Sequence, residues 1–469
     1  MGVIWAIVFG KNKFSRVDFE EIEIEISPFE TFVRLSEKFK DIYILESILG
    51  PEKLAEFSYI GFNPSLKVIL ENNKIKMIDK EGRIIVDESN PSDLFIKLRE
   101  ILGENRVNNN FNRLIGGLVG FISYDIVRHW ENISDKYTEL NYADFQFGLF
   151  NEGIIFDHEK ERVYYYHSGD NNLKEVLELL STEREIGTID YTEPISNINK
   201  ETFENNVDIA KEYVRSGDIF QVVLSRKYEF KISGDLLSIY KSLRMINPSP
   251  YMYYFKSNDL NIIGASPEML VRVTDNQIET FPIAGTRPRD EDMEKNKKLT
   301  EELLSDEKER AEHVMLVDLA RNDVGQIARF GSVKVPEFMQ VHQFSHVQHI
   351  VSKVIGELKD EKDCFEAIRA IFPAGTVSGA PKIRAMEIIQ ELEKESRGPY
   401  AGALGYFSKN MCADFAITIR TLVVKGNKAY IQAGAGIVAD SVPEKEWFET
   451  EQKASALIDA LKIAKNGEQ

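Results

Sequence analysis

The chain has 469 residues, and its 76 acidic side chains outnumber the 58 basic ones, which gives a formal charge of -18 at pH 7. This balance argues against a nucleic-acid partner, which would need a basic surface, but it does not exclude a small anionic substrate. Hydrophobic residues make up 43% and charged residues 29%, as in a globular protein of two or three structural units.

The predicted elements mix strands and helices. Strand-like runs at 18–26 and 66–77 are followed by a glycine-punctuated run at 116–125 that predicts a buried strand. The charged and polar segment 168–199 marks a boundary between an N-terminal region, 1–190, and a second region, 197–465. Because strands and helices do not alternate strictly, the order favours an α+β fold built on large antiparallel sheets. In the second region we predict helices at 200–216, 291–304, 306–322, 363–371, 381–396 and 442–464, and strands at 218–226, 261–273, 414–424 and 428–433.

The cysteines and the N-terminus bear on the protein's location. Cys364 and Cys412 are the only two cysteines, too few for a disulfide framework or a thiolate zinc site. The apolar run at 3–9 is too short to span a membrane and lacks the cleavage pattern of a signal peptide. We therefore expect a cytoplasmic protein that is not inserted in a membrane.

Two acidic pairs with the same spacing, Glu309 with Glu312 and Glu446 with Glu449, are the strongest candidates for a functional site. Side chains at positions i and i+3 share one face of a helix, so two such helices could direct four carboxylates at one point. In so acidic a chain, a single pair of this kind is better explained by a solvated helix face. The context of the pairs decides between these interpretations.

Apolar neighbours place both pairs toward a core. Glu312 is in helical line with Leu316, and Glu446 continues an apolar stripe that includes Leu457. Buried carboxylates must be protonated or paired with a cation. The sequence therefore predicts a hard divalent cation held by oxygen ligands at these pairs.

Helix-start signals precede each pair. Ser305 or Asp306 would cap the first helix, and residues 441–444 have the pattern of a capping box with a proline in the first turn. Lys453 lies one turn beyond Glu449 and can share its face.

Two glycine-containing segments could bind an anion. Residues 372–382 form a loop that enters a predicted helix, whose first amides attract anions, but the glycine spacing of a Walker phosphate loop is missing. In the second segment, 432–440, the amides of Gly434, Ala435 and Gly436 could grip a carboxylate. Arg420, at the end of a predicted strand, is a natural bidentate partner for the same group.

Three of the seven histidines, His342, His346 and His349, are close in the sequence. At helical spacing they would form a metal-binding face. Because 343–352 has partly the pattern of a strand, we expect instead one functional and two structural histidines, with His349 as a general acid.

Four motifs make the chain resemble the anthranilate synthase component I family, a group of chorismate-utilising enzymes. They are Phe-Pro-Ile-Ala-Gly-Thr-Arg-Pro-Arg at 281–289, the segment 308–323, Pro-Ala-Gly-Thr-Val-Ser-Gly-Ala-Pro-Lys at 373–382, and the glycines at 434–436 ahead of the acidic helix. The resemblance covers most of the chain and is strongest from about 200 to 465. It implies a sandwich of large, mainly antiparallel sheets with helices packed outside, an N-terminal regulatory and structural region, and a catalytic second region.

Two positions distinguish the activities that share this fold. Members that add water to chorismate use a lysine base where this chain has Gln221, and 4-aminodeoxychorismate synthases place a nucleophilic lysine where it has Ala284. The resemblance therefore implies attack by ammonia at ring carbon 2 and loss of pyruvate, which gives anthranilate for tryptophan biosynthesis. Aminodeoxychorismate synthase component I and isochorismate or salicylate synthase are the alternatives.

The resemblance implies a metal and its ligands. Mg2+ would be bound by Glu312 and Glu449, with Glu309 and Glu446 acting directly or through water, and would anchor the ring carboxylate of chorismate. Magnesium commonly keeps several waters, so not all four carboxylates need touch it.

It also implies roles for the other site residues. His349 would protonate the departing hydroxyl with help from Thr376, while Lys453 and Glu309 would complete the catalytic set. The residues that would bind chorismate are Arg420, Tyr400, Gly434, Ala435, Gly436, Gly285 and Thr286.

Ammonia must come from another chain, because neither cysteine has the setting of a glutaminase nucleophile. We expect a glutamine amidotransferase subunit in a hetero-oligomer such as a heterotetramer. L-Tryptophan is the expected inhibitor, although a strand end packed on a proline-rich turn would explain the same segments. The residues that resemble a tryptophan site are Glu46, Ser47, Pro250, Tyr251 and Met252.

Two hypotheses of other classes use the same residues. A carboxylate-bridged dimetal protein could use the four glutamates, although helix bundles of that kind expect Glu-x-x-His motifs. An acidic scaffold or metal-sensing protein would leave the loops at Thr376 and Gly434 without a substrate.

Overall fold

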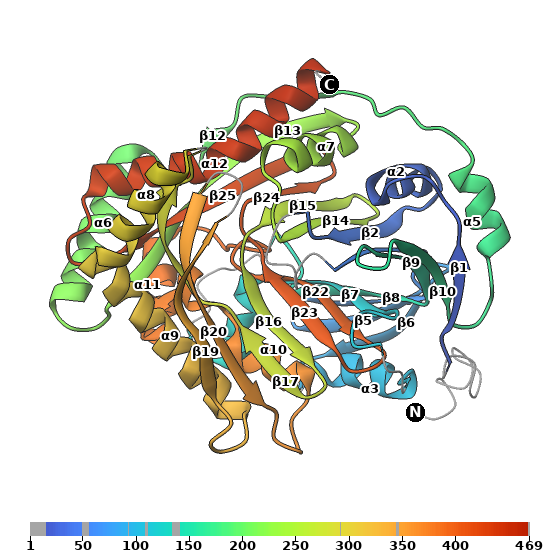
Figure 1. Cartoon of the computed structure of the whole chain (residues 1–469), viewed down its shortest axis with the longest axis horizontal. Helices are drawn as coiled ribbons and strands as arrows, with labels where there is room; N and C mark the ends of the chain where they lie inside the picture. The colour runs from blue at the N-terminus through green and yellow to red at the C-terminus, as the bar shows by residue number, and fades with distance from the viewer. Residues whose placement is uncertain are drawn as a thin grey trace.

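Two large antiparallel sheets form the body of the structure (Figure 1). The computed structural model describes residues 16–48, 56–91, 93–107, 111–133, 141–290, 292–343 and 347–467. The apolar run at 3–9 and His346 lie outside these ranges. No helix within the ranges is long and apolar enough to cross a membrane. The predicted α+β class, with helices outside two antiparallel sheets, is confirmed.

The first sheet draws its strands from both ends of the chain, and 13 of them fall in the described ranges. In spatial order they are β1 (Asp18–Ile22), β10 (Arg162–His167), β9 (Glu152–Asp157), β3 (Phe57–Phe62), β2 (Asp41–Glu46), β14 (Tyr251–Ser257), β15 (Leu260–Ser266), β24 (Thr421–Lys425), β25 (Lys428–Ile437), β13 (Gln221–Gly234) and β11 (Ile189–Tyr191), while β12 (Ile195–Ser196) and β21 (Gly379–Ala380) also pair with β13.

The second sheet has 12 strands among the described residues. In spatial order they are β18 (Ile283–Pro288), β20 (Val347–Glu357), β17 (Gln277–Thr280), β16 (Met269–Thr274), β23 (Ala413–Ile417), β22 (Ala403–Ser408), β7 (Gly117–Ile122), β8 (Phe145–Phe150), β4 (Leu66–Glu71), β5 (Lys74–Asp79) and β6 (Ile84–Ser89), and β19 (Lys334–Gln343) pairs with β20.

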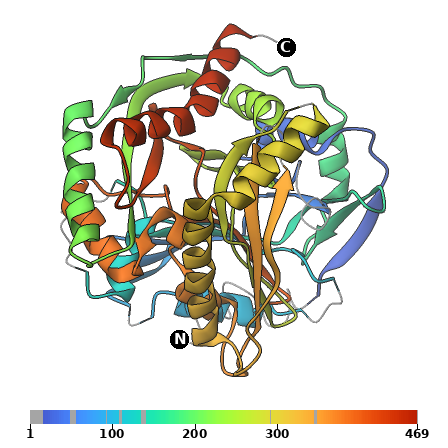
Figure 2. The ribbon, with the colours of Figure 1, turned by 60° about the vertical axis from the view of Figure 1, so that its left-hand side comes forward.

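Helices cover the outside of the sheets. Four of them bury apolar side chains against the first sheet: α2 (Pro28–Lys38), α5 (Leu173–Leu180), α7 (Leu237–Ile246) and α12 (Pro443–Asn466). Figure 2 shows α9 and α12 on the same side of the molecule. The other α-helices are α3 (Ile96–Glu104), α4 (Val127–Trp130), α6 (Lys200–Arg215), α8 (Met293–Ser305), α9 (Glu307–Ile327), α10 (Cys364–Ile371) and α11 (Lys382–Leu392), with 3-10 turns η1 (Tyr124–Ile126) and η2 (Gly375–Val377).

Aromatic rings fill the space between the two sheets. Phe255 of the first sheet meets Phe121 of the second edge-on, with ring centroids 6.1 Å apart, and Tyr43 meets Phe150 in the same way at 4.7 Å. Edge-to-face pairs add to the stability gained by burying the rings. This core fixes the sheets relative to each other, and with them the segments that cross between the sheets.

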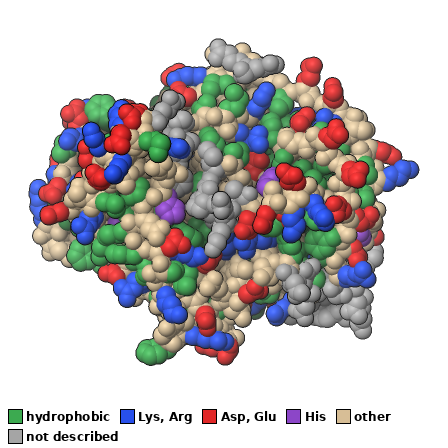
Figure 3. Space-filling view, in the orientation of Figure 1, with side chains coloured by type: hydrophobic (Ala, Val, Ile, Leu, Met, Phe, Trp, Pro, Cys, Tyr) green, Lys and Arg blue, Asp and Glu red, His purple; other side chains and the backbone are tan. Residues whose placement is uncertain are grey.

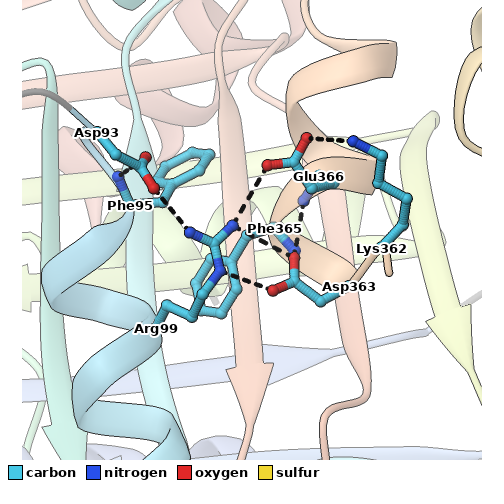
Figure 4. A network of polar contacts seen from close by, with 7 residues as sticks. All are labelled: Asp93, Phe95, Arg99, Lys362, Asp363, Phe365 and Glu366. Carbon is cyan, nitrogen blue, oxygen red and sulfur yellow. Dashed lines mark hydrogen bonds and ion pairs between the residues drawn. The ribbon is translucent and has the colours of Figure 1, made fainter. Parts of the chain in front are cut away.

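The N-terminal and second regions are hydrogen-bonded to each other in both sheets, through β2 with β14 and β7 with β22. Figure 4 shows a further link, in which Arg99 of α3 pairs with Asp93, with Asp363 at the start of α10, and with Glu366 at 2.8, 2.7 and 3.4 Å. The segment 168–199 thus connects elements that share sheets, and the division into two regions stays a prediction.

Three predicted strands are each two strands. In the run 66–77, Asn72 and Asn73 have φ of 50° and 58° and close a two-residue hairpin between β4 and β5. Pro267 separates β15 from β16 in the run 261–273, and Arg420, with φ of 50°, separates β23 from β24 in the run 414–424. At the last two breaks the chain crosses from one sheet to the other, which a continuous apolar pattern cannot reveal.

The predicted helix starts are partly confirmed. Asp306 caps α9, since its side chain accepts from the amides of Lys308 and Glu309. The capping box at 441–444 is wrong: α12 has Val442 at its cap position without a side-chain bond, because the Ser441 hydroxyl accepts the amide of Val438 instead. The proline predicted in the first turn is there.

Candidate active site

Glu268 and Arg420 lie at two adjacent crossings of the chain between the sheets. The amide of Ile417 donates to the carbonyl of Glu268 at 3.0 Å, and the amide of Ala265 donates to the carbonyl of Arg420 at 3.2 Å. The two crossings are therefore hydrogen-bonded to the strands beside each other, and the Arg420 guanidinium is close enough to the Glu268 carboxylate to affect its pKa. Glu268 is not among the residues predicted from the sequence, although the proline before it, in an apolar run, is a signal for a break in the strand.

Glu268 is the most strongly perturbed carboxyl group of this region. Burial raises its pKa to about 7, although the Thr376 hydroxyl, which donates to Oε1 at 2.8 Å, and the charges of Lys453 and Arg420 favour the ionised form. A cavity of about 40 Å³ borders Glu268 and Thr376. A carboxyl group poised near neutral pH can exchange a proton with a bound molecule.

The four glutamates predicted as metal ligands come from two helices, and each carboxylate has neighbours of its own. Glu312 accepts from Gln221 Nε2 at 3.1 Å, Glu309 pairs with Arg287 at 3.3 Å, and Glu449 pairs with Lys453 at 2.7 Å. No three His, Cys, Asp or Glu side chains in the described ranges are grouped closely enough to hold a metal ion.

One interaction links the two acidic pairs, since the charge of Glu449 on α12 helps to raise the pKa of Glu312 on α9. The pKa of Glu312 is raised by burial and by the charges of Glu309 and Glu449. The pKa of Glu446 is raised by burial and by Glu449, although Ser441 opposes the shift. Half-buried carboxylates that repel one another are a donor set that fits a divalent cation.

The glycines at 434 and 436 belong to β25, next to β13. Gly434 lies opposite Ser225 and Gly436 opposite Val223, whereas Ala435 lies opposite Leu224. The Gly434 carbonyl accepts from Lys453 Nζ at 3.0 Å, so it points away from β13. Because residues along an antiparallel strand alternate in direction, the amides of Gly434 and Gly436 face the open edge and that of Ala435 faces β13. Only the amides of Gly434 and Gly436, and not the predicted third amide of Ala435, are therefore placed to bind a carboxylate at this edge.

Neither glycine could carry a side chain without displacing a site residue. A Cβ at Gly434 would lie 2.7 Å from the Tyr400 hydroxyl oxygen, and one at Gly436 would lie 2.5 Å from Gln221 Nε2. Tyr400 and Gln221, which the resemblance had already singled out, therefore both lie against β25, Tyr400 at Gly434 and Gln221 at Gly436. The buried Gln221 Oε1 has no hydrogen-bond partner among the described residues.

His349 lies on β20 beside the motif that contains Ala284. Its Nδ1 is 2.8 Å from the Gly285 carbonyl and 3.2 Å from the Thr286 hydroxyl, so Nδ1 carries a proton and donates to Gly285. Burial lowers the pKa of His349, and the charge of Arg420 lowers it further. The imidazole is therefore neutral near pH 7.

His342 and His349 are on strands, as the sequence favoured, and His346 lies outside the described residues. His342 of β19 lies directly opposite His349 of β20, which puts the two on one face of the sheet, and no metal-binding group of three includes them within the described ranges. Whether one is functional and the others structural stays a prediction.

The residues of the predicted tryptophan site are brought together by the pairing of β2 with β14, where Glu46 lies opposite Met252. Glu46 accepts from Tyr240 at 2.8 Å and from Arg244 at 2.6 Å, and Tyr251 donates to Asp414 at 2.9 Å. Pro250 precedes β14 and is buried. Ser47 Oγ and Asn247 Nδ2 are both buried without a hydrogen-bond partner in the described part of the chain.

Charged side chains of both signs are interspersed on the face seen in Figure 3. Among the described side chains of this face, no extended patch of a single sign is seen.

The chain belongs to the family of chorismate binding enzymes, whose model matches residues 43–459. It is therefore an enzyme of a class that acts on chorismate. This membership sets aside the dimetal and scaffold hypotheses.

Several relatives carry the name anthranilate synthase component 1. That of Methanothermobacter marburgensis is 47% identical over 462 residues, which cover 98% of each chain, and that of Saccharolobus solfataricus is 46% identical over 438 residues, or 93% of this chain and 97% of the relative. The crystal structure of anthranilate synthase component I from Streptococcus pneumoniae matches with a TM-score of 0.77 at 38% identity, over 88% of this chain and 94% of that one. The menaquinone-specific isochorismate synthase of Escherichia coli, at 18% identity and a TM-score of 0.72 over 95% and 94% of the chains, shares the fold.

Proposed function

We propose that this chain is the large component of a cytoplasmic anthranilate synthase, which converts chorismate and ammonia to anthranilate and pyruvate. The full-length similarity to relatives of that name supports the proposal. The observation that carries the proposal is the hydrogen bond from the Gln221 amide to Glu312 in the acidic site. Family members that add water need a lysine base at the position of Gln221. Ala284, buried beside His349, likewise provides no nucleophile.

The reaction needs two proton transfers on the ring. Ammonia attacks carbon 2 while the hydroxyl at carbon 4 leaves as water, and the aminated ring then loses its carbon 2 proton and the enolpyruvyl group, which departs as pyruvate. Glu268, protonated up to about pH 7, is suited to give the departing hydroxyl its proton. His349 is neutral, so we assign it proton acceptance in place of the acid role implied by resemblance.

Mg2+ would be held by Glu312 and Glu449, with Glu309 and Glu446 in direct or water-mediated contact. The bound ion would neutralise the ring carboxylate of chorismate. Burial and the charges of neighbouring glutamates raise the pKa values of Glu312 and Glu446, and this supports the assignment, since a cation would offset both effects.

The enolpyruvyl carboxylate would be bound at the open edge of β25. Arg420 supplies a guanidinium, Tyr400 a hydroxyl, and Gly434 and Gly436 two amides. Thr286 and Gly285 would line the ring side of the site next to His349. Lys453 links Glu449 to the Gly434 carbonyl and would keep the acidic helix in register with this edge.

We further propose that a separate glutamine amidotransferase subunit supplies the ammonia in a hetero-oligomer, and that L-tryptophan inhibits the enzyme at Glu46, Ser47, Pro250, Tyr251 and Met252. The unpaired polar atoms of Ser47 and Asn247 favour a polar ligand there, because a buried hydroxyl or amide without a partner costs free energy.

The proposal is tested by incubating the purified chain with chorismate, Mg2+ and an ammonium salt at alkaline pH and separating the products. Fluorescent anthranilate and an equal amount of pyruvate should accumulate without glutamine. Isochorismate, salicylate or aminodeoxychorismate as the main product would overturn it.

A further inference from the structure

A buried arginine that contacts no predicted site residue by hydrogen bond lies behind the site. Arg397 has a side chain that is 1% exposed and forms a two-point ion pair with Glu393, from Nε at 2.9 Å and from Nη2 at 2.6 Å. Nη1 donates to the Val377 carbonyl at 2.8 Å and Nη2 to the Val223 carbonyl at 2.7 Å. One guanidinium thus joins two chain segments that are 154 positions apart, 377 minus 223.

Each of these contacts leads directly to a site residue. Val377 follows Thr376, the residue that donates to Glu268, and Val223 is two positions after Gln221 on β13. The guanidinium carbon also lies 5.7 Å from the ring centroid of Tyr400, within the range of a cation–π contact. Arg397 therefore contacts the residue that follows Thr376, the strand that carries Gln221, and the ring of Tyr400.

The rest of the surroundings holds the guanidinium in one orientation. The Tyr124 ring lies 4.6 Å from it, and Asp125 accepts from the amides of Arg397 and Gly398 at 3.4 and 2.6 Å. Glu393 also accepts from the amide and the hydroxyl of Ser225 at 2.8 Å each, which fixes the carboxylate to β13. The planar fork of an arginine can serve several acceptors at once, whereas the ammonium of a lysine is a single point.

We propose that Arg397 is a positioning residue for chorismate, which aligns the Thr376 loop, β13 and Tyr400 through its bonds to Val377, Val223 and Glu393. This proposal depends on the proposed function in one respect: it assumes that these segments contact chorismate. It assigns Arg397 no contact with the substrate itself.

Arg99 provides a matched control, because it is also an arginine with several acidic partners (Figure 4). It pairs with Asp93, Asp363 and Glu366 and lies 5.3 Å from the Phe365 ring, but none of these residues belongs to the site. Arg99→Lys should cost stability without moving a site element.

The experiment compares Arg397→Lys with Arg99→Lys. Binding of chorismate in the presence of Mg2+ and absence of ammonia is measured by calorimetry, steady-state kinetics are measured with ammonia, and unfolding is followed by heating. We expect Arg397→Lys to raise the chorismate Kd and KM roughly tenfold or more, since displacements of about 1 Å weaken aligned contacts strongly. The KM for ammonia should stay within about twofold, and Arg99→Lys should leave the chorismate Kd and KM unchanged.

A purely structural role predicts a different result. It would lower the folded fraction, and with it the apparent kcat, while the chorismate KM of the remaining folded enzyme stayed at the wild-type value. That result, or equal KM values in the two variants, would overturn the proposal. Should Arg397→Lys not fold, Glu393→Gln takes its place under the same criterion, because it keeps the shape and the bond from Ser225 and removes the charge.

A failure of the proposed function would be seen separately. It would appear as wild-type enzyme that makes a product other than anthranilate, while the comparison of chorismate Kd values between the variants would still decide the role of Arg397.

Discussion

The Thr376 hydroxyl donates a hydrogen bond of 2.8 Å to the buried carboxylate of Glu268, and these two residues are 108 positions apart in the chain. The bond ties the glycine-containing loop to the crossing between β15 and β16. It also favours the ionised form of Glu268, against the burial that raises the pKa to about 7.

Glu268→Gln should lower kcat by roughly 10²–10⁴-fold, because a general acid commonly contributes that much. In the wild-type enzyme, activity at a fixed concentration of free ammonia should fall as the pH rises through about 7, since the acid must be protonated. Thr376→Val removes a bond that lowers the pKa, so it should shift this fall to higher pH. Rates measured between pH 5.5 and 9.5 check both variants. If Glu268→Gln still lost activity as the pH rises through about 7, the assignment of Glu268 as the acid would be contradicted.

Glu268 should also make the stability depend on pH. Its pKa is raised in the folded state, so folding favours the protonated carboxyl, and the free energy of unfolding should fall as the pH rises from the ordinary value of a glutamate toward about 7. Below that window the carboxyl is protonated in both states, so the contribution is fully present, and it is lost as the pH rises through about 7. Glu268→Gln should flatten this part of the curve in denaturant titrations, whereas a curve that keeps the wild-type slope would show that another group titrates.

Removing one predicted metal ligand should abolish Mg2+-dependent turnover. Glu312→Gln or Glu449→Gln loses a carboxylate that a hard cation needs, while the fold is kept because both side chains are half-buried. Activity as a function of Mg2+ concentration gives the measurement. The matched control is Glu444→Gln on the same helix, whose exposed carboxylate pairs with Lys200 at 2.8 Å and should be dispensable. Full activity in either ligand variant would rule out the site.

Gly436→Ala should disturb the site through Gln221. The added Cβ would lie 2.5 Å from Gln221 Nε2 and would push the amide away from Glu312, so kcat/KM should fall by roughly tenfold or more. Gly325→Ala is the control: Gly325 is in α9 with open space around its Cβ position, and the change should raise the free energy of unfolding by about 0.5–1 kcal/mol with unchanged kinetics. Normal kinetics for Gly436→Ala would mean that the amide has no role.

Ser47→Arg should remove inhibition by L-tryptophan and spare the activity. The larger, charged side chain would replace the buried and unpaired Ser47 Oγ and displace a ligand bound there. Inhibition curves should shift by roughly tenfold or more in tryptophan concentration, a loss of at least about 1.4 kcal/mol of binding. Identical curves for wild type and variant would place the inhibitor elsewhere.

Much of the fold was accessible from the sequence, because long amphipathic helices and apolar strands carry strong periodic signals. The start of the helix that carries Glu309 and Glu312 was predicted closely, with Asp306 as one of two cap candidates, although α9 extends to Ile327 and not to 322. The strand breaks at Pro267 and Arg420 were not, because apolar residues continue on both sides wherever the chain passes from one buried sheet to the other. Glu268 was missed for the same reason.

The arrangement of the site was less accessible. The sequence could name Gln221 and Gly436 through motifs, but not that the two are in contact, since this depends on the pairing of β13 with β25 across 215 positions, 436 minus 221. Nor could it show that His349 is neutral, because its pKa depends on burial between strands and on the distant Arg420.

The sharing of both sheets between the two ends of the chain has a consequence for how the protein is made. β7 pairs with β22 and β2 with β14, so these early strands, which also pair with β8 and β3, acquire their second neighbours only once the much later strands have been synthesised. Pairings of such high sequence separation slow folding and leave strand edges uncovered in the meantime. Folding should therefore be completed late, and fragments that end before β22 should aggregate or bind chaperones.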